Sequence, residues 1–84
     1  MEIGKIVKSK QGRDKGKVYV VYEIVDNDFV KLVNGDTRKI DNPKKKRVKH
    51  LDVVDESPIF DKQTFKDSDI KKLCKTYFCG GKNA

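Results

Sequence analysis

The stretch KVYVVYEIV, residues 17–25, decides the fold of this chain. Almost every residue in it is β-branched or aromatic, and the apolar side chains occupy both parities of a strand. A strand of this kind is typical of the centre of a sheet, where both faces are covered. We therefore predict a central strand that is buried on both sides.

Shorter strands are predicted before and after it. Turn signals separate them, namely the polar loop before Lys17, the cluster Asp26 to Asp28, the pair Asn34-Gly35 and the turn at Pro43. The predicted strands span residues 2–8, 29–33, 37–40 and 47–51. Five short strands joined by tight turns are typical of a small closed or half-closed barrel, whose last strand has to pair with the first to remove open edges.

The rest of the chain has a different pattern. Residues 52–66 mix acidic residues with a proline and read as a linker. From Asp67 the apolar residues follow helical spacing, and they are Ile70, Leu73, Cys74, Tyr77 and Phe78. Gly80-Gly81 is expected to end this helix. The predicted organisation is therefore a barrel over 1–51, a linker over 52–66 and a helix over 67–79, whose apolar stripe packs on the barrel or on a partner.

Charge is distributed unevenly along the 84 residues, which carry a net +7. The excess lies before Leu51, with +3 in residues 1–25 and +5 in residues 43–50. A basic excess on a small domain favours a polyanionic partner, usually nucleic acid or a membrane surface. The longest apolar run is Val18 to Tyr22, far below the ~18 residues of a membrane helix, and no signal-peptide core begins the chain. We expect a cytoplasmic protein that does not enter a membrane, with Cys74 and Cys79 as thiols.

The loop GRDKGK, residues 12–17, places two glycines among cations. It differs from a nucleotide-binding P-loop, which has four residues between its glycines and a Ser or Thr where Val18 stands. Glycine allows the backbone to turn sharply and to approach a nucleic-acid strand closely. Arg13 can bind a phosphate or a guanine edge, or stack on a base.

Residues 2–35, which contain this loop, the long apolar strand and the strand that ends in Asn34-Gly35, resemble a KOW motif. KOW domains are SH3-like barrels of ribosomal proteins and transcription elongation factors, and they usually bind RNA and less often protein. GDTRKIDNPKKKRVKHL and TFKDSDIKKL are similar to the later parts of small bacterial KOW-domain proteins related to large-subunit ribosomal proteins of the archaeal and eukaryotic kind. The resemblance implies a mainly β, SH3-like five-stranded barrel with a short C-terminal helix, and ribosomal RNA as the partner.

The run PKKKRVKH, residues 43–50, has three interpretations: a nuclear import address, a solvated charged loop, or a rim that binds phosphates. We favour the third, because the run leads into the strand predicted to close the barrel and so belongs to a folded surface. The predicted RNA-binding residues are Lys8, Lys10, Arg13, Lys15, Gly16, Lys17, Arg38, Lys39, Lys44, Lys45, Lys46, Arg47, Lys49 and His50. Tyr19, Tyr22 and Phe29 can stack on bases, although core packing is the favoured interpretation for all three.

Catalysis and cofactors have little support in the sequence. His50 is the only histidine and has no nucleophile beside it. Cys74 and Cys79 project in different directions from a helix, so we predict no metal site, no cofactor and no enzymatic activity.

A second hypothesis is a protein-interaction adaptor of the ribosome or the transcription machinery. In that case the barrel edge or the stripe of Ile70, Leu73, Tyr77 and Phe78 would bind a ribosomal protein or RNA polymerase. In either case we expect the free protein to be a monomer.

Overall fold

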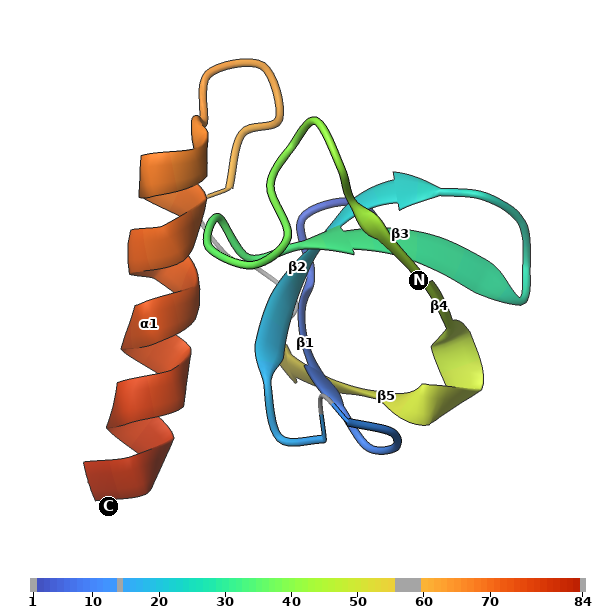
Figure 1. Cartoon of the computed structure of the whole chain (residues 1–84), viewed down its shortest axis with the longest axis horizontal. Coiled ribbons are helices and arrows are strands. Elements are labelled where there is room, and N and C mark those ends of the chain that lie inside the picture. Colours follow the sequence, from blue (N-terminus) through green and yellow to red (C-terminus); the bar gives the residue numbers. More distant parts are fainter. Residues whose placement is uncertain (1, 14, 56–59, 84) are drawn as a thin grey trace.

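The computed structural model describes residues 2–13, 15–55 and 60–83, with side chains up to Tyr77. Within these residues five strands and one α-helix follow one another (Figure 1). Their order is β1 (Ile6–Ser9), β2 (Val18–Ile24), β3 (Phe29–Val33), β4 (Lys44–Arg47), the 3₁₀ turn η1 (Val48–His50), β5 (Leu51–Asp55) and α1 (Asp67–Asn83). The mainly β class with a C-terminal helix that starts at Asp67 is confirmed.

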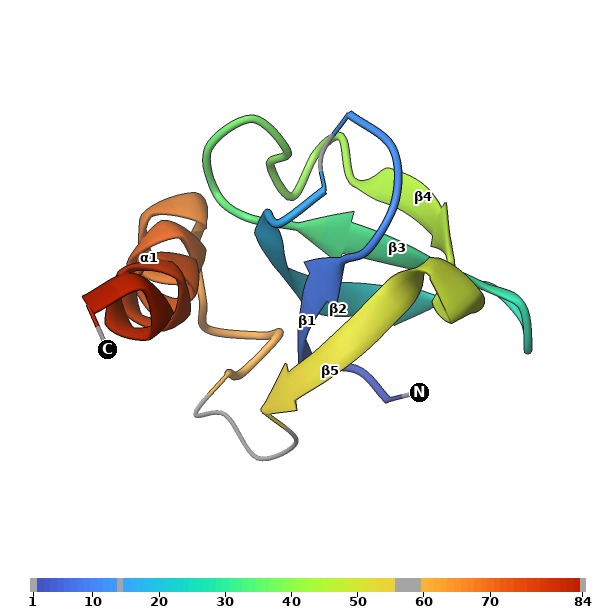
Figure 2. The same cartoon turned by 90° about the horizontal axis from the view of Figure 1, so that it is seen from below.

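The strands form one antiparallel sheet in the order β4-β3-β2-β1-β5. The apolar strand β2 lies at its centre, as predicted, and the last strand pairs with the first, with Val53 opposite Val7. The edge strands β4 and β5 follow each other in the chain and are joined only by η1. The sheet is therefore strongly bent, as Figures 1 and 2 show.

Both faces of β2 are covered, which confirms the two-sided burial predicted for it. Val18 and Val20 belong to an apolar cluster that also contains Ile70 of α1. Tyr19 and Val21 point to the opposite face and belong to a second cluster inside the bend of the sheet. Because side chains alternate along a strand, one seven-residue segment contributes to both cores.

The apolar stripe of α1 packs on the outer face of the sheet. Ile70 is fully buried, Cys74 is 6% exposed, and Leu73 and Tyr77 pack against the same cluster. The Tyr77 hydroxyl donates a hydrogen bond to the carboxylate of Asp55, which ties the helix to β5. The stripe therefore completes the fold of its own chain.

The predicted fourth strand over residues 37–40 is wrong, because this segment is a loop. The Asn34 side chain organises it, since its Oδ1 accepts the backbone N–H groups of Asp36 and Arg38, both at 2.9 Å. The N–H of Ile40 donates to Asp67 Oδ1 at 2.8 Å. Side-chain oxygens thus accept the backbone N–H groups that a strand would use for pairing. The bond to Asp67 also connects the loop to α1.

The predicted strand over 47–51 is also wrong in its bounds. β4 ends at Arg47, η1 intervenes, and β5 continues to Asp55, inside the segment assigned to the linker. The free edge of β1 explains this, because it pairs with residues 51–55 and satisfies their backbone groups. The helix likewise continues past Gly80-Gly81 to Asn83. Glycine costs a helix about 1 kcal/mol and, unlike proline, does not obstruct it.

Gly35 allows α1 to lie directly against the end of β3. Its φ is +76°, and a Cβ there would lie 2.1 Å from the Asp67 carbonyl oxygen and 2.5 Å from the Lys71 nitrogen. Both neighbours are helix backbone and cannot move independently of α1. Gly16 has a similar φ of +90°, but nothing surrounds its Cβ position within 4 Å.

We predict that Gly35→Ala destabilises the protein by about 3 kcal/mol, because positive φ and backbone overlap act together. Gly16→Ala has only the conformational cost, about 1–2 kcal/mol. Chemical denaturation measures the free energy of unfolding of both variants. The difference between their losses reports the contact of Gly35 with α1. Equal losses would show that α1 does not pack on Gly35.

Candidate nucleic-acid interface

The lysine run forms strand β4, so its side chains point alternately to two faces. β4 pairs with β3, which places Lys44 opposite Leu32 and Lys46 opposite Val30. Leu32 and Val30 are fully buried inside the bend of the sheet, so Lys44 and Lys46 share the inner face. Lys45 and Arg47 occupy the outer face, opposite Lys31 and Phe29. The lysine run, predicted to form one rim, is therefore divided between two faces of the sheet.

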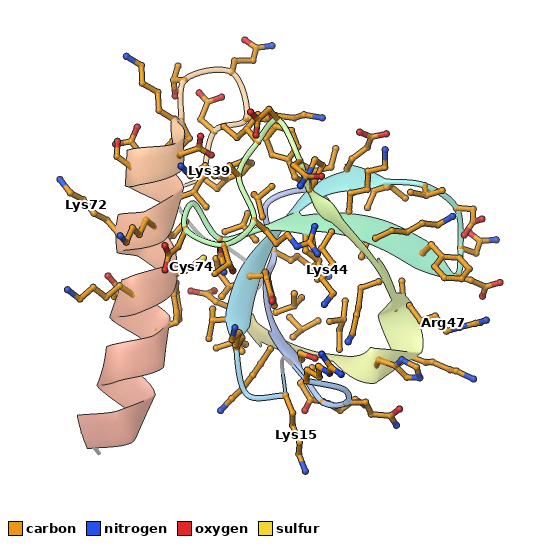
Figure 3. The ribbon with its side chains drawn as sticks, in the orientation of Figure 1. Lys15, Lys39, Lys44, Arg47, Lys72 and Cys74 are labelled. Carbon is orange, nitrogen blue, oxygen red and sulfur yellow. The ribbon has the colours of Figure 1, made fainter. Side chains whose placement is uncertain are left out.

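Two hydrogen bonds bring the glycine loop next to the lysine run. Lys46 Nζ donates to the Gln11 carbonyl oxygen at 2.9 Å, and the Lys10 N–H donates to the His50 carbonyl oxygen at 2.8 Å. The loop between β1 and β2 thus lies beside β4 and η1 at one end of the sheet, as Figure 2 shows. Figure 3 shows Arg47 on the side of the molecule away from α1 and Lys15 at the lower end of the sheet.

His50 lies within electrostatic range of several of these cations. Desolvation lowers its pKa below the usual value, and the charges of four neighbours lower it further. We call these four, Lys10, Lys46, Arg47 and Lys49, the η1 cation cluster. They come from three segments, namely the connection between β1 and β2, strand β4 and η1. An anion placed here would be attracted by all four at once.

The glycine loop extends this positive surface. Arg13 and Lys15 are exposed, and the turn is held by bonds from the Lys15 N–H to the Gly12 carbonyl and from the Gly16 N–H to Ser9. Gly12 and Gly16 both have positive φ, at 89° and 90°. The open space around the Gly16 Cβ position leaves this part of the backbone accessible to a ligand.

Lys8 and Lys10 stand next to β5. Lys8 is exposed on β1 and pairs with Asp52, while Lys10 Nζ lies 3.6 Å from an Asp52 oxygen. Both partners of this ion pair are well exposed, so it stabilises the protein little and leaves Lys10 able to bind a phosphate.

Three of the predicted residues lie nearer to α1 than to the η1 cation cluster. Lys17 lines a hollow of about 330 Å³ together with Lys71 and Lys75 of the helix. Arg38 and Lys39 belong to the loop that bonds to Asp67, and Figure 3 shows Lys39 beside the first turn of α1. The predicted residues are thus spread over more of the molecule than one surface.

The outer face of β3 and β4 contains an aromatic residue whose surroundings the sequence analysis missed. The Phe29 ring belongs to neither buried cluster, and it is only partly buried. Lys45 Nζ and the Arg47 guanidinium carbon lie 4.7 and 4.8 Å from its centroid. The alternation in FVKLV could have predicted this position, because it places Phe29 and Lys31 on one face of the strand and the apolar Val30 and Leu32 on the other.

The other two aromatic candidates have structural roles. Tyr19 is 2% exposed inside the sheet, as the core interpretation predicts. Tyr22 packs edge-on against Phe60, with ring centroids 6.3 Å apart, and Lys62 Nζ lies 4.6 Å from its centroid. Phe29 is therefore the aromatic residue of the three that remains available to a base.

The adaptor hypothesis loses the helix stripe as a docking surface. Ile70, Leu73 and Tyr77 pack on the sheet of their own chain, and the Phe78 side chain lies outside the described residues. The edge strands β4 and β5 each have one neighbour in the sheet, so docking at an edge stays a prediction.

Cys74 is a free, buried thiol, and desolvation raises its pKa to about 12. Such a thiol stays protonated at neutral pH, which suits packing rather than nucleophilic chemistry. The side chain of Cys79 lies outside the described residues.

No group of three or more potential metal ligands occurs among the residues that the structure describes. Within the same residues, α1 lacks the length and apolar character needed to cross a bilayer.

No protein-family model matches this chain, and no curated protein matches it. The resemblance to KOW domains stays a prediction from the motifs. Function has to be inferred from the geometry of the charged surface.

For an RNA bound at this surface, we predict that affinity rises as the pH falls from about 7.5 to 5.5, through the usual His50 pKa of 6.5. His50 is mainly neutral in the free protein at neutral pH, and nearby phosphates would favour its charged form, so binding takes up a proton. Each unit by which RNA raises the His50 pKa adds up to about tenfold in affinity at the acidic end. His50→Gln should abolish the dependence, measured by fluorescence anisotropy.

The control for this experiment is thermal unfolding at each pH. The folded-state pKa of His50 lies below its unfolded value, so the unfolded chain binds more protons between the two. Stability should therefore fall slightly as the pH drops through 6.5, opposite in sign to the binding effect. If wild type and His50→Gln showed the same pH dependence of binding, protonation of His50 would not be its cause.

Proposed function

We propose that this protein binds structured RNA through phosphate contacts, and that the RNA is ribosomal. The observation that carries the proposal is the contact of Lys46 with the Gln11 carbonyl, which brings the lysine run to the glycine loop. The η1 cation cluster and the exposed loop residues Arg13 and Lys15 then lie at one end of the sheet. Cations on a rigid scaffold can neutralise several neighbouring phosphates together.

Phosphate contacts of this kind give affinity without reading the base sequence. If four to six phosphates are neutralised, the logarithm of affinity should fall with the logarithm of salt concentration with a slope of roughly −3 to −4. The η1 cation cluster with Arg13 and Lys15 supplies six cations, which is enough for that number. Recognition would therefore depend on the shape of the RNA and on any unpaired bases near the surface.

Two features favour RNA over other polyanions. The glycine loop and the strand that follows resemble a KOW motif, whose usual partner is RNA. Phe29 adds a partly exposed aromatic ring beside Lys45 and Arg47, and single-stranded nucleic acids use such rings for stacking. Association with the ribosome, and with it a cytoplasmic location, follows from the resemblance alone.

Paired charge variants test the surface. We predict that Lys15→Gln with Lys49→Gln reduces the salt slope for a ribosomal RNA fragment by about 1.4, because two phosphate contacts are lost. Lys66→Gln with Lys72→Gln is the matched control: all four side chains are exposed, the charge change is identical, and Lys72 points away from the sheet (Figure 3). Equal slopes for the two variants would show that binding follows net charge and not this surface.

The ribosomal part of the proposal has a separate test. We expect the tagged protein to sediment with purified ribosomes through a sucrose gradient at low salt and to dissociate at high salt, because its contacts are electrostatic. The Lys15/Lys49 variant should dissociate at lower salt than the Lys66/Lys72 variant. RNA binding without co-sedimentation would retain the RNA-binding function and remove the ribosome from it.

A further inference from the structure

We propose that the outer face of β3 and β4 is a stacking site for one unpaired nucleobase, so that the RNA target has a single-stranded nucleotide beside the phosphate contacts. This face, the Phe29 platform, consists of Phe29, Lys31, Lys45 and Arg47. The inference rests on the proposed function and adds to it the class of RNA that is bound.

The backbone holds the platform in a defined geometry. Phe29 pairs with Arg47 and Lys31 with Lys45 in the antiparallel ladder, so all four side chains rise from the same face. The carboxylate of Asp26 accepts the N–H groups of Asp28 and Phe29 at 2.8 and 2.9 Å, which fixes the start of β3. The backbone N–H of Val48 donates to the Asp28 carbonyl oxygen at 2.8 Å, which fixes the end of β4.

The Arg47 guanidinium is pre-ordered for stacking. Its central carbon lies 4.8 Å from the Phe29 ring centroid, within the roughly 6 Å range of cation–π attraction. A guanidinium group is planar, so a base can stack on the face that Phe29 leaves free, or on Phe29 itself after Arg47 moves aside.

Charge favours a nucleotide over an uncharged aromatic ligand. Lys45 and Arg47 both lie within 5 Å of the same ring centroid, so both positive charges adjoin one ring. A phosphate attached to the stacked base would lie near both cations and relieve their repulsion. The base would provide the stacking surface, and its phosphate would provide the negative charge. A ligand with both is one nucleotide of a single strand.

A shallow hollow beside Arg47 offers space for the edge of the stacked ring. It measures about 190 Å³ and is lined by Asn27, Asp28, Arg47, Val48 and Lys49. Pockets for drug-sized molecules usually have about 300–1,000 Å³, so this hollow suits part of a nucleotide and not a separate ligand. Because Arg47 and Lys49 also belong to the η1 cation cluster, the platform and the phosphate-binding surface are continuous.

The test compares two arginine-to-lysine changes on two RNA probes. Arg47→Lys keeps the charge but removes the planar group, and Arg13→Lys makes the same change in the glycine loop. The probes are a blunt RNA hairpin and the same hairpin with a short single-stranded 3′ extension. We expect Arg47→Lys to weaken binding of the extended probe about tenfold more than binding of the blunt probe, because the planar group serves stacking and the retained charge serves phosphate contact. Arg13→Lys should affect both probes alike.

Phe29→Leu provides a second variant that keeps all charges. Phe29 belongs to neither buried cluster, so we expect the variant to fold, which circular dichroism checks, and to lose the preference for the extended probe. If Arg47→Lys lowers the affinity for both probes equally, the stacking site is disproved and phosphate binding remains. If the wild-type protein binds neither probe, the proposed RNA-binding function is disproved together with it.

Discussion

The hydrogen bond from Lys46 Nζ to the Gln11 carbonyl joins two parts of the sheet that its strand order keeps apart. β4 and β1 are separated by β3 and β2, and only the bend of the sheet brings the edge strand to the loop that follows β1. The bond from the Lys10 N–H to the His50 carbonyl supports the same approach from η1. Each of these contacts is weak alone. The first depends on the bend, the second continues the β1–β5 ladder, and the cationic surface depends on both.

Strand alternation turns the side chains of the lysine run to two faces of the sheet. Lys46 turns to the inner side and reaches the glycine loop, whereas Lys45 and Arg47 turn outward and meet Phe29. Had the run been an irregular loop, all its cations could have gathered on one side. As a strand it connects the cations beside the glycine loop to a face with an aromatic ring, and the two meet at Arg47.

The helix contributes to function indirectly, because it completes the core. A chain of 84 residues buries little apolar surface, and α1 covers the outer face of β2 with Ile70 and Cys74. Gly35 makes this possible, since any side chain there would overlap the helix backbone. α1 covers the outer face of the sheet at β2 and does not cover η1 and β4, which lie farther from the helix (Figures 1 and 2).

Local pattern in the sequence determined the mainly β class, the two-sided burial of β2 and the start of α1 at Asp67, because these depend on neighbouring residues and on alternation or helical spacing. It also identified the cations, since charge is read directly from composition. The tertiary structure decided that β5 extends to Asp55, because the edge of β1 pairs with the backbone of residues 51–55. It also decided that residues 37–40 form a loop, because the side chains of Asn34 and Asp67 accept hydrogen bonds from the backbone there. It likewise decided which cations share a surface and that Phe29 lies among them. Those relations depend on strand register and on the bend of the sheet, which are set by contacts between residues far apart in the chain.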